Sequence, residues 1–160
     1  MKGKIIGGTL AAVVIASPMG AYYEGVFPVG YADPVGIPTD CVGDTHGAKV
    51  GVQRFTFEEC LRRYDERLQA NWDNGLANCI QQDVTVTQGA ALISFADNAG
   101  IGATCGSTMV RMINAGVSAD TWCQQMKRWT KARLVGVTIE LPGLVKRRAA
   151  ETNMCLGRIG

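Results

Sequence analysis

The chain has 160 residues, of which 47% are hydrophobic, 19% are charged and 7% are aromatic. This is the length of one domain, and the share of apolar residues excludes an intrinsically disordered chain and a collagen-like fibre. The formal net charge is only +2 and Lys and Arg are spread along the chain, which gives no support for nucleic-acid binding.

An uncharged hydrophobic stretch follows two lysines at the N-terminus. Lys2 and Lys4 precede residues 5–23, IIGGTLAAVVIASPMGAYY, and the next charge is Glu24. As a helix, this stretch would reach about 28 Å at a rise of about 1.5 Å per residue, close to the hydrocarbon thickness of a bilayer. The two lysines place the N-terminus on the cytoplasmic side, so the rest of the chain would be exported.

Three interpretations of this stretch remain open. A cleaved signal peptide would end near the small residues Ala16 or Ala21. A permanent membrane anchor is disfavoured by the many glycines and alanines. The third interpretation is an anchor weak enough to leave the membrane later, because Gly, Ser, Thr and Pro contribute less free energy to insertion than Leu does.

Residues 24–55 differ in composition from the rest of the chain. They are rich in Gly, Pro and Asp, which predicts short strands joined by tight turns around Asp33-Pro34 and Gly36. From Thr56 the pattern becomes helical, because Thr56 and Glu59 match a capping box. Apolar residues at helical spacing then predict one long helix to about residue 80: Leu61, Tyr64, Leu68, Leu76 and Ile80.

The remaining sequence predicts further helices, each opened by a residue that favours a helix N-terminus. They are 87–98 with Thr87 as its cap, 107–116 with Ser107 as its cap, 118–129 from Ser118, and 142–156 with Pro142 as its first residue. The whole pattern predicts an α+β, mainly helical fold, with a small β-containing lobe followed by a larger helical lobe.

Six cysteines are present, and no two have the C-x-x-C spacing of zinc sites or thioredoxin-like redox motifs. The single histidine, His46, leaves a metal cluster short of ligands, so we predict neither a metal nor a cofactor. An even number of widely spaced cysteines indicates three disulfides formed in an oxidising compartment, with buried free thiols as the alternative. From the elements expected to carry them, we predict the pairs Cys41–Cys60, Cys79–Cys105 and Cys123–Cys155.

Glu24, Asp33 and Thr39 form the most informative pattern, Glu-x8-Asp-x5-Thr. Cleavage of a glycosidic bond needs a protonated carboxyl group for the leaving oxygen and a second carboxylate that activates water or stabilises positive charge. The apolar neighbours of Glu24 in YYEGVF favour a protonated carboxyl, whereas solvent at the turn favours an ionised Asp33. By residue type alone, an ordinary helix-end acid and a turn aspartate are the alternative.

This pattern resembles the signature of the bacteriophage-type lysozyme family. The resemblance continues in order through SFADNAGIG at residues 94–102, STMVRMINAG, and LPGLVKRRAAE near the C-terminus. It implies a lysozyme-like fold with a β-hairpin lobe. It also implies a muramidase that hydrolyses the β-1,4 bond between N-acetylmuramic acid and N-acetylglucosamine of peptidoglycan and so lyses the host bacterium. Glu24 would then be the general acid, and Asp33 with Thr39 would hold the attacking water.

Two other functions stay open. A lytic transglycosylase would use Glu24 but would have little need for Asp33 and Thr39, and a non-catalytic, membrane-anchored wall-binding protein would need none of them. Within the resemblance, Asn98 either lines the substrate cleft or caps a helix end. Arg147 and Arg148 match the paired arginines of the family, with a solvated helix face as the alternative, and we assign His46 no catalytic role.

The N-terminus resembles the signal-anchor-release branch of this family, whose members are exported, tethered and inactive until the membrane is depolarised. This implies a signal anchor over residues 1–23 and a catalytic domain over 24–160. The enzyme would pass from the periplasmic face of the inner membrane into the periplasm and act there as a monomer on glycan strands. Residues 1–40 contain no cysteine, so no cysteine in the anchor or beside Glu24 and Asp33 can hold the enzyme inactive. We therefore expect the trigger to be refolding of the released segment, with Tyr22 and Tyr23 helping to complete the first helix.

Overall fold

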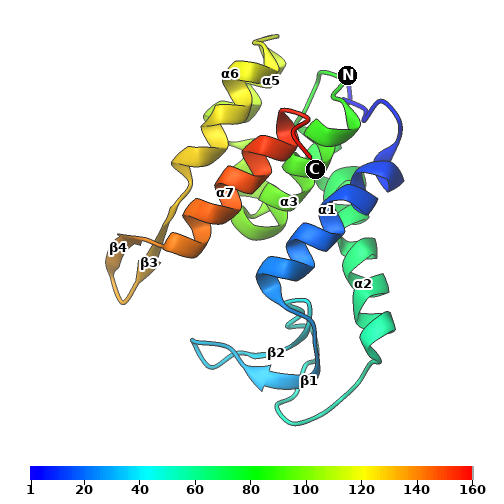
Figure 1. Ribbon diagram of the computed structural model, residues 1–160, viewed down its shortest axis with the longest axis vertical. Coiled ribbons are helices and arrows are strands. Elements are labelled where there is room, and N and C mark those ends of the chain that lie inside the picture. Colours follow the sequence, from blue (N-terminus) through cyan, green and yellow to red (C-terminus); the bar gives the residue numbers. More distant parts are fainter. Residues whose placement is uncertain (160) are drawn as a thin grey trace.

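The computed structural model describes residues 1–159. Figure 1 shows the long helices α1, α3 and α7 across the middle of the molecule, with the β1–β2 hairpin at the lower end of α1 and the β3–β4 hairpin extending from the start of α7. In chain order the elements are α1 (Thr9–Glu24), β1 (Phe27–Ala32), β2 (Pro38–Cys41), α2 (Phe57–Ala70), the π-helical turn η1 (Asn71–Gly75), the 3₁₀ turn η2 (Leu76–Asn78), α3 (Val86–Ala99), α4 (Ile101–Cys105), α5 (Thr108–Asn114), α6 (Ala119–Trp122), the 3₁₀ segment η3 (Cys123–Arg128), β3 (Lys131–Leu134), β4 (Val137–Glu140) and α7 (Pro142–Cys155).

Helix α3 is the centre of the core. Every residue from Gly89 to Ala96 is buried, so this part of the helix has no face in water. Helices α1 and α7 both pack against α3, and α2 packs against α1. The two antiparallel hairpins stay small and separate. The architecture is the mainly helical α+β fold that the sequence predicts, with β1–β2 as the small lobe.

The hydrophobic N-terminal stretch forms α1 and belongs to this core. Ala12 and Ala16 are fully buried. Gly20 faces Tyr64 of α2 so closely that an added Cβ would lie 1.7 Å from the tyrosine Oη. Large apolar side chains are exposed on the same segment: Ile6, Leu10 and Val14. Among residues 1–159, no helix combines the length and the hydropathy needed to cross a membrane.

Most of the predicted helix starts are confirmed. Thr56 closes a capping box with Glu59 at the start of α2, Ser107 caps α5, and Pro142 is the first residue of α7. The predicted cap at Thr87 is wrong, because Thr85 is the N-cap of α3 and forms a capping box with Gln88.

Other helices differ in type or were not predicted. The long helix expected to residue 80 is α-helical only to Ala70. It continues as the wider π-helical turn η1 and then as the tighter 3₁₀ turn η2. The helix expected over 118–129 is α-helical for one turn and continues as 3₁₀ in η3. Helix α4 and the β3–β4 hairpin were not predicted from the sequence.

Three disulfides connect the elements. Cys41–Cys60 joins β2 to α2, Cys79–Cys105 joins the residue after η2 to α4, and Cys123–Cys155 joins η3 to α7. These are the three pairs expected from the sequence. The first of them lies next to the site described below.

Candidate active site

A cleft of about 810 Å³ opens between the loop after β2, helix α2 and the C-terminal end of α3. This volume is in the range of sites that bind small molecules or a few units of a polymer. Glu24 lines the cleft, and so do charged side chains from α2 and α3: Arg63, Glu66, Arg67 and Asp97. Among residues 1–159, no three His, Cys, Asp or Glu side chains gather in a way that could hold a metal ion.

Glu24 is held at the end of a helix. It is the last residue of α1, and Gly25 turns the chain away with a φ of 74°, a conformation that glycine adopts without strain. Arg147 of α7 donates from Nη1 to Glu24 Oε1 at 2.7 Å. On the side of the β lobe, a Cβ added to Gly43 would lie 3.6 Å from Glu24 Oε2. The carboxyl group therefore lies between α7 and the loop after β2, with 33% of the side chain exposed.

Arg147 and Arg148 do not lie on a solvated helix face, so that alternative is wrong. Their side chains are 3% and 2% exposed. Arg147 donates to Glu24, to the carboxylate of Glu151 at 3.1 Å and to the backbone oxygen of Ser94 at 3.2 Å. A buried cation therefore lies beside the Glu24 carboxyl group, in addition to the apolar neighbours that the sequence suggested.

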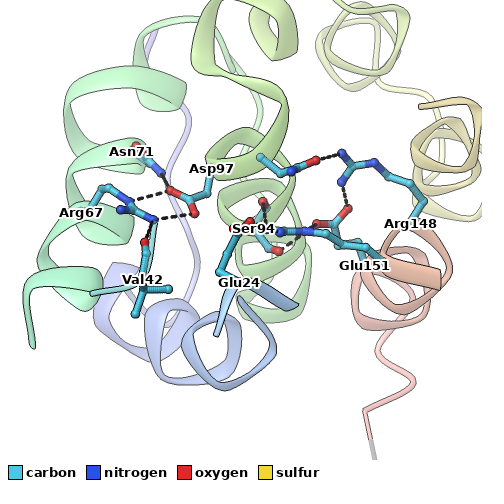
Figure 2. A network of polar contacts seen from close by, with 10 residues as sticks. Glu24, Val42, Arg67, Asn71, Ser94, Asp97, Arg148 and Glu151 are labelled. Carbon is cyan, nitrogen blue, oxygen red and sulfur yellow. Dashed lines mark hydrogen bonds and ion pairs between the residues drawn. The ribbon is translucent and has the colours of Figure 1, made fainter. Parts of the chain in front are cut away.

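Asn98 lines the cleft and also contacts the buried Arg148 of α7. Its Oδ1 accepts a hydrogen bond from Arg148. Arg148 in turn binds Glu151 (Figure 2). Helix α3 ends with Gly100 as its C-cap, so Asn98 does not cap the helix. The structure therefore places Asn98 in the cleft wall, and its role in substrate binding stays a prediction.

Asp33 and Thr39 lie on the β1–β2 hairpin. The Oδ1 atom of Asp33 accepts hydrogen bonds from the backbone N–H groups of Val35, at 2.9 Å, and Ile37, at 2.8 Å. Thr39 pairs with Tyr31 across the hairpin and is 4% exposed, and its hydroxyl donates to the backbone oxygen of Ile37 at 3.0 Å. Glu24 lines the cleft, but neither Asp33 nor Thr39 does.

The carboxylates of Glu24 and Asp33 both affect Tyr31 of β1. Its burial, and then the negative charges of Glu24 and Asp33, raise the pKa of the Tyr31 hydroxyl above its ordinary value. Both carboxylates therefore act on the same side chain of β1. Glu24 lines the cleft, the hairpin carries Asp33 and Thr39, and Tyr31 lies within electrostatic range of both carboxylates.

Two ion pairs hold the loop after β2. Arg54 forms hydrogen bonds of 2.8 and 3.0 Å with the buried carboxylate of Asp40, and Arg63 binds Asp44 at 2.7 Å. Both guanidinium groups lie over the ring of Phe55, at 4.9 and 4.1 Å from its centroid. These contacts set the shape of the cleft wall that carries Gly43.

A second network joins this loop to the helices (Figure 2). Arg67 binds both carboxylate oxygens of Asp97, at 2.9 and 3.1 Å, and also donates to the backbone oxygen of Val42 at 2.8 Å. Asn71 adds a hydrogen bond of 3.2 Å to Asp97. Because Asp97 belongs to α3 and Arg67 to α2, the network fixes both sides of the cleft relative to the β lobe.

Glu151, Arg67 and Asp97 were not predicted from the sequence to have a role at the site. For Glu151 a signal was present, because Arg147 and Arg148 precede it by four and three residues, the spacings that bring charged side chains together on a helix. Arg67 and Asp97 are on different helices, and no local spacing predicts their contact.

A family model, a sequence relative and two solved structures are similar to most of this chain. The family model for phage lysozyme matches residues 21–151. A SAR-endolysin of Pseudomonas phage phiKMV is 31% identical over 98% of this chain and 91% of its own length. Among solved structures, the muramidase domain of SpmX from Asticaccaulis excentricus has a TM-score of 0.74 at 29% identity, covering 89% of this chain and 95% of that chain. An endolysin from Escherichia coli O157:H7 phage FAHEc1 shares the fold, with a TM-score of 0.79 at 24% identity over 99% of this chain and 98% of that chain.

Proposed function

Because the chain belongs to the phage lysozyme family, we propose that this endolysin is a muramidase. It hydrolyses the β-1,4 bond between N-acetylmuramic acid and N-acetylglucosamine of peptidoglycan and thereby lyses the host cell. The observation that carries the proposal is the position of Glu24, which lines the cleft at a helix end and is held there by Arg147. The muramidase named among the solved structures supports the same substrate.

Glu24 is the general acid in this proposal. Its carboxyl group is partly exposed to the cleft, where a glycosidic oxygen can approach it. Donation of its proton to that oxygen lets the bond break with positive charge developing on the sugar ring. Arg147 and the backbone at Gly43 limit the directions in which the carboxyl can point.

Asp33 and Thr39 act on the water molecule. Backbone N–H groups engage Oδ1 of Asp33, and this orients the carboxylate so that Oδ2 can accept a proton of the attacking water. The Thr39 oxygen donates to Ile37 and can accept a second hydrogen bond from the same water. Attack from the side opposite Glu24 would invert the anomeric centre. Because these residues lie outside the cleft lining, the glycan strand has to extend over the β1–β2 hairpin.

The experiment is a turbidity assay on purified sacculi. Glu24→Gln should reduce the lysis rate by about 100-fold or more, because proton donation to a leaving group contributes that much or more to the rate. The matched control is Glu58→Gln, which removes an exposed carboxylate from the first turn of α2 and should leave the rate within about twofold of wild type. Near-normal lysis by a folded Glu24→Gln protein would refute the assignment.

Variants of the hairpin residues separate hydrolysis from the alternative, a lytic transglycosylase. Asp33→Asn should be almost as inactive as Glu24→Gln, and Thr39→Ser, which keeps the hydroxyl, should retain more activity than Thr39→Val. A transglycosylase uses no attacking water, so full activity in Asp33→Asn would favour it.

We further propose that the enzyme is exported with residues 1–23 as a membrane anchor, which later leaves the membrane to form α1 beside the catalytic residues 24–160. The name of the phiKMV relative, SAR-endolysin, supports this. The two sides of α1 support it too, because Ala12 and Ala16 are buried in the protein core while Leu10 and Val14 are exposed. While the segment lies in the bilayer, Glu24 is held away from Arg147 and the enzyme is inactive.

Cell fractionation and intact mass test the release step. We expect a full-length species in the inner membrane that moves to the periplasm when the proton-motive force collapses. A mature protein that begins after Ala16 or Ala21 would instead show a cleaved signal peptide, and it would have lost the buried alanines of α1.

A further inference from the structure

Glu151 of α7 is a fully buried carboxylate with several partners. It accepts hydrogen bonds from Arg147 at 3.1 Å, from the hydroxyl of Ser94 at 2.9 Å and from Arg148. Its side chain has no exposed area. A buried carboxylate of this kind is costly unless it is fully paired, so its partners have to be present in the folded protein. None of the steps proposed above uses Glu151.

Arg147 is shared between Glu151 and Glu24. Its Nε donates to Glu151 and its Nη1 to Glu24, while Nη2 binds the backbone oxygen of Ser94. Burial alone would lower the pKa of the Arg147 guanidinium, but the charge and hydrogen bond of Glu151, followed by those of Glu24, raise it above its ordinary value. At 3% exposure, the guanidinium has almost no contact with solvent and takes its orientation from these partners.

From these contacts we infer that Glu151 is a positioning residue for Glu24, which holds the Arg147 guanidinium toward the cleft and offsets its positive charge so that Glu24 can carry a proton at working pH. The inference rests on the proposed role of Glu24 as the general acid. An unshared guanidinium 2.7 Å from a carboxyl group would strongly favour the ionised form, which cannot donate a proton. Glu151 weakens this effect by adding a negative charge on the other side of the same guanidinium.

The other titratable groups around Glu24 come from several elements. Charged side chains of α2, of α3 and of the loop after β2 line the same cleft: Arg63, Glu66, Arg67, Asp97 and Asp44, with His46 beside them. The remaining titratable neighbours are tyrosines. Burial raises the pKa values of Tyr23 of α1, Tyr31 of β1 and Tyr64 of α2 above the ordinary value, so all three are neutral in the working range. The negative charge of Asp33 acts on Tyr31 from the turn beyond β1. Among the described residues, Arg147 is the cation that forms an ion pair with Glu24, and Glu151 is paired to the same guanidinium.

The test is a titration of Glu24 followed by ¹³C NMR of the labelled side-chain carboxyl, in wild type and in the isosteric variant Glu151→Gln. Loss of the negative charge should move the Glu24 midpoint to lower pH by about one unit, and the alkaline limb of the activity profile should move with it. An unchanged midpoint in the folded variant would overturn the inference. The titration does not depend on activity, so failure of the Glu24 assignment itself would appear only in the lysis of sacculi by Glu24→Gln.

The matched control is Thr152→Val. Thr152 is the next residue of α7, is fully buried, and donates to the backbone oxygen of Arg148 at 2.7 Å without binding Arg147 or Glu24. It should lower stability without moving the Glu24 midpoint. Glu151→Asp keeps the charge and should return the midpoint most of the way to the wild-type value. A shift in Thr152→Val equal to that in Glu151→Gln would mean that loss of packing, and not charge, is the cause.

A second measurement needs no change at Glu151. If Glu151 holds the guanidinium, the Arg147 Nε–H signal should stay resolved and protected from solvent exchange in Glu24→Gln. Rapid exchange of that N–H in the folded Glu24→Gln protein would show that Glu24 holds Arg147, and would overturn the inference even if Glu151→Gln does not fold.

Discussion

Asp44 and Arg63 keep the loop after β2 against the cleft. Arg63 donates to Asp44 at 2.7 Å, and the backbone N–H of His46 donates to the same carboxylate at 2.9 Å. Burial would raise the pKa of Asp44, but these hydrogen bonds lower it below its ordinary value. Because Gly43 directly precedes Asp44 and lies next to Glu24, this single carboxylate helps to shape the surroundings of the general acid.

The variant Asp44→Asn should change how the stability of the protein depends on pH. A carboxylate whose folded-state pKa is lowered contributes stability above its unfolded pKa, about 3.9, and loses that contribution as the pH falls through the folded-state pKa. The variant should be less stable by roughly 1 kcal/mol at neutral pH. Urea unfolding of both proteins should show this difference shrinking below about pH 4. A difference that stays constant down to pH 2 would contradict the role of the charge.

Single residues were predictable where their roles follow from local spacing. The capping box of Thr56 and Glu59 is one such case. The spacing of Glu24, Asp33 and Thr39 predicts their catalytic roles, and these roles stay a prediction. The partner of Glu24 was not predictable, because Arg147 is 123 residues away and its burial depends on how α7 packs against α3. Thr85 was missed as the cap of α3 because Thr87 offers the same hydroxyl two residues later.

Among the elements, α1 and the β3–β4 hairpin show what local sequence does not reveal. The uncharged run of residues 5–23 fits both a bilayer and a protein core, so composition alone did not predict that Ala12 and Ala16 would be buried in the fold. The β3–β4 hairpin was missed because its turn has Val135 at a φ of 49°, followed by Gly136. A β-branched residue is unfavourable there, and the usual Asn-Gly or Asp-Gly signal is absent.

The close packing of α1 on α2 at Gly20 can be tested with Gly20→Ala. In a free helix, Gly20→Ala would be stabilising. Here the new methyl group would lie 1.7 Å from Oη of Tyr64, so we expect a loss of about 1 to 3 kcal/mol in the free energy of unfolding. The control is Gly102→Ala in α4, where an added Cβ meets open space and should leave stability unchanged or raise it. Equal melting temperatures for Gly20→Ala and wild type would mean that α1 does not pack on Tyr64.

At the scale of the whole molecule, the disulfides tie together segments that lie far apart in the sequence. Cys123–Cys155 spans 32 residues and fixes α7, the helix that carries Arg147 and Glu151. The fold class and the division into a small β lobe and a larger helical lobe were predictable from the change of pattern at Thr56. The cleft was not, because it forms where three separate elements meet.

The Cys123–Cys155 disulfide should contribute strongly to the stability of the whole chain. Replacing both Cys123 and Cys155 by Ser should lower the free energy of unfolding by about 3 to 4 kcal/mol, because the unfolded chain gains the freedom of an open loop. Urea unfolding under non-reducing conditions measures this. If the double variant and wild type have the same unfolding midpoint, the bond does not stabilise the folded chain.

Mass spectrometry of the fragments released from purified sacculi tests the proposed reaction most directly. Hydrolysis by the Glu24, Asp33 and Thr39 arrangement adds one water across each cleaved bond, so we predict fragments that end in a reducing N-acetylmuramic acid. Fragments that end in an anhydro-sugar, in a reducing N-acetylglucosamine or at a cut peptide would contradict the account.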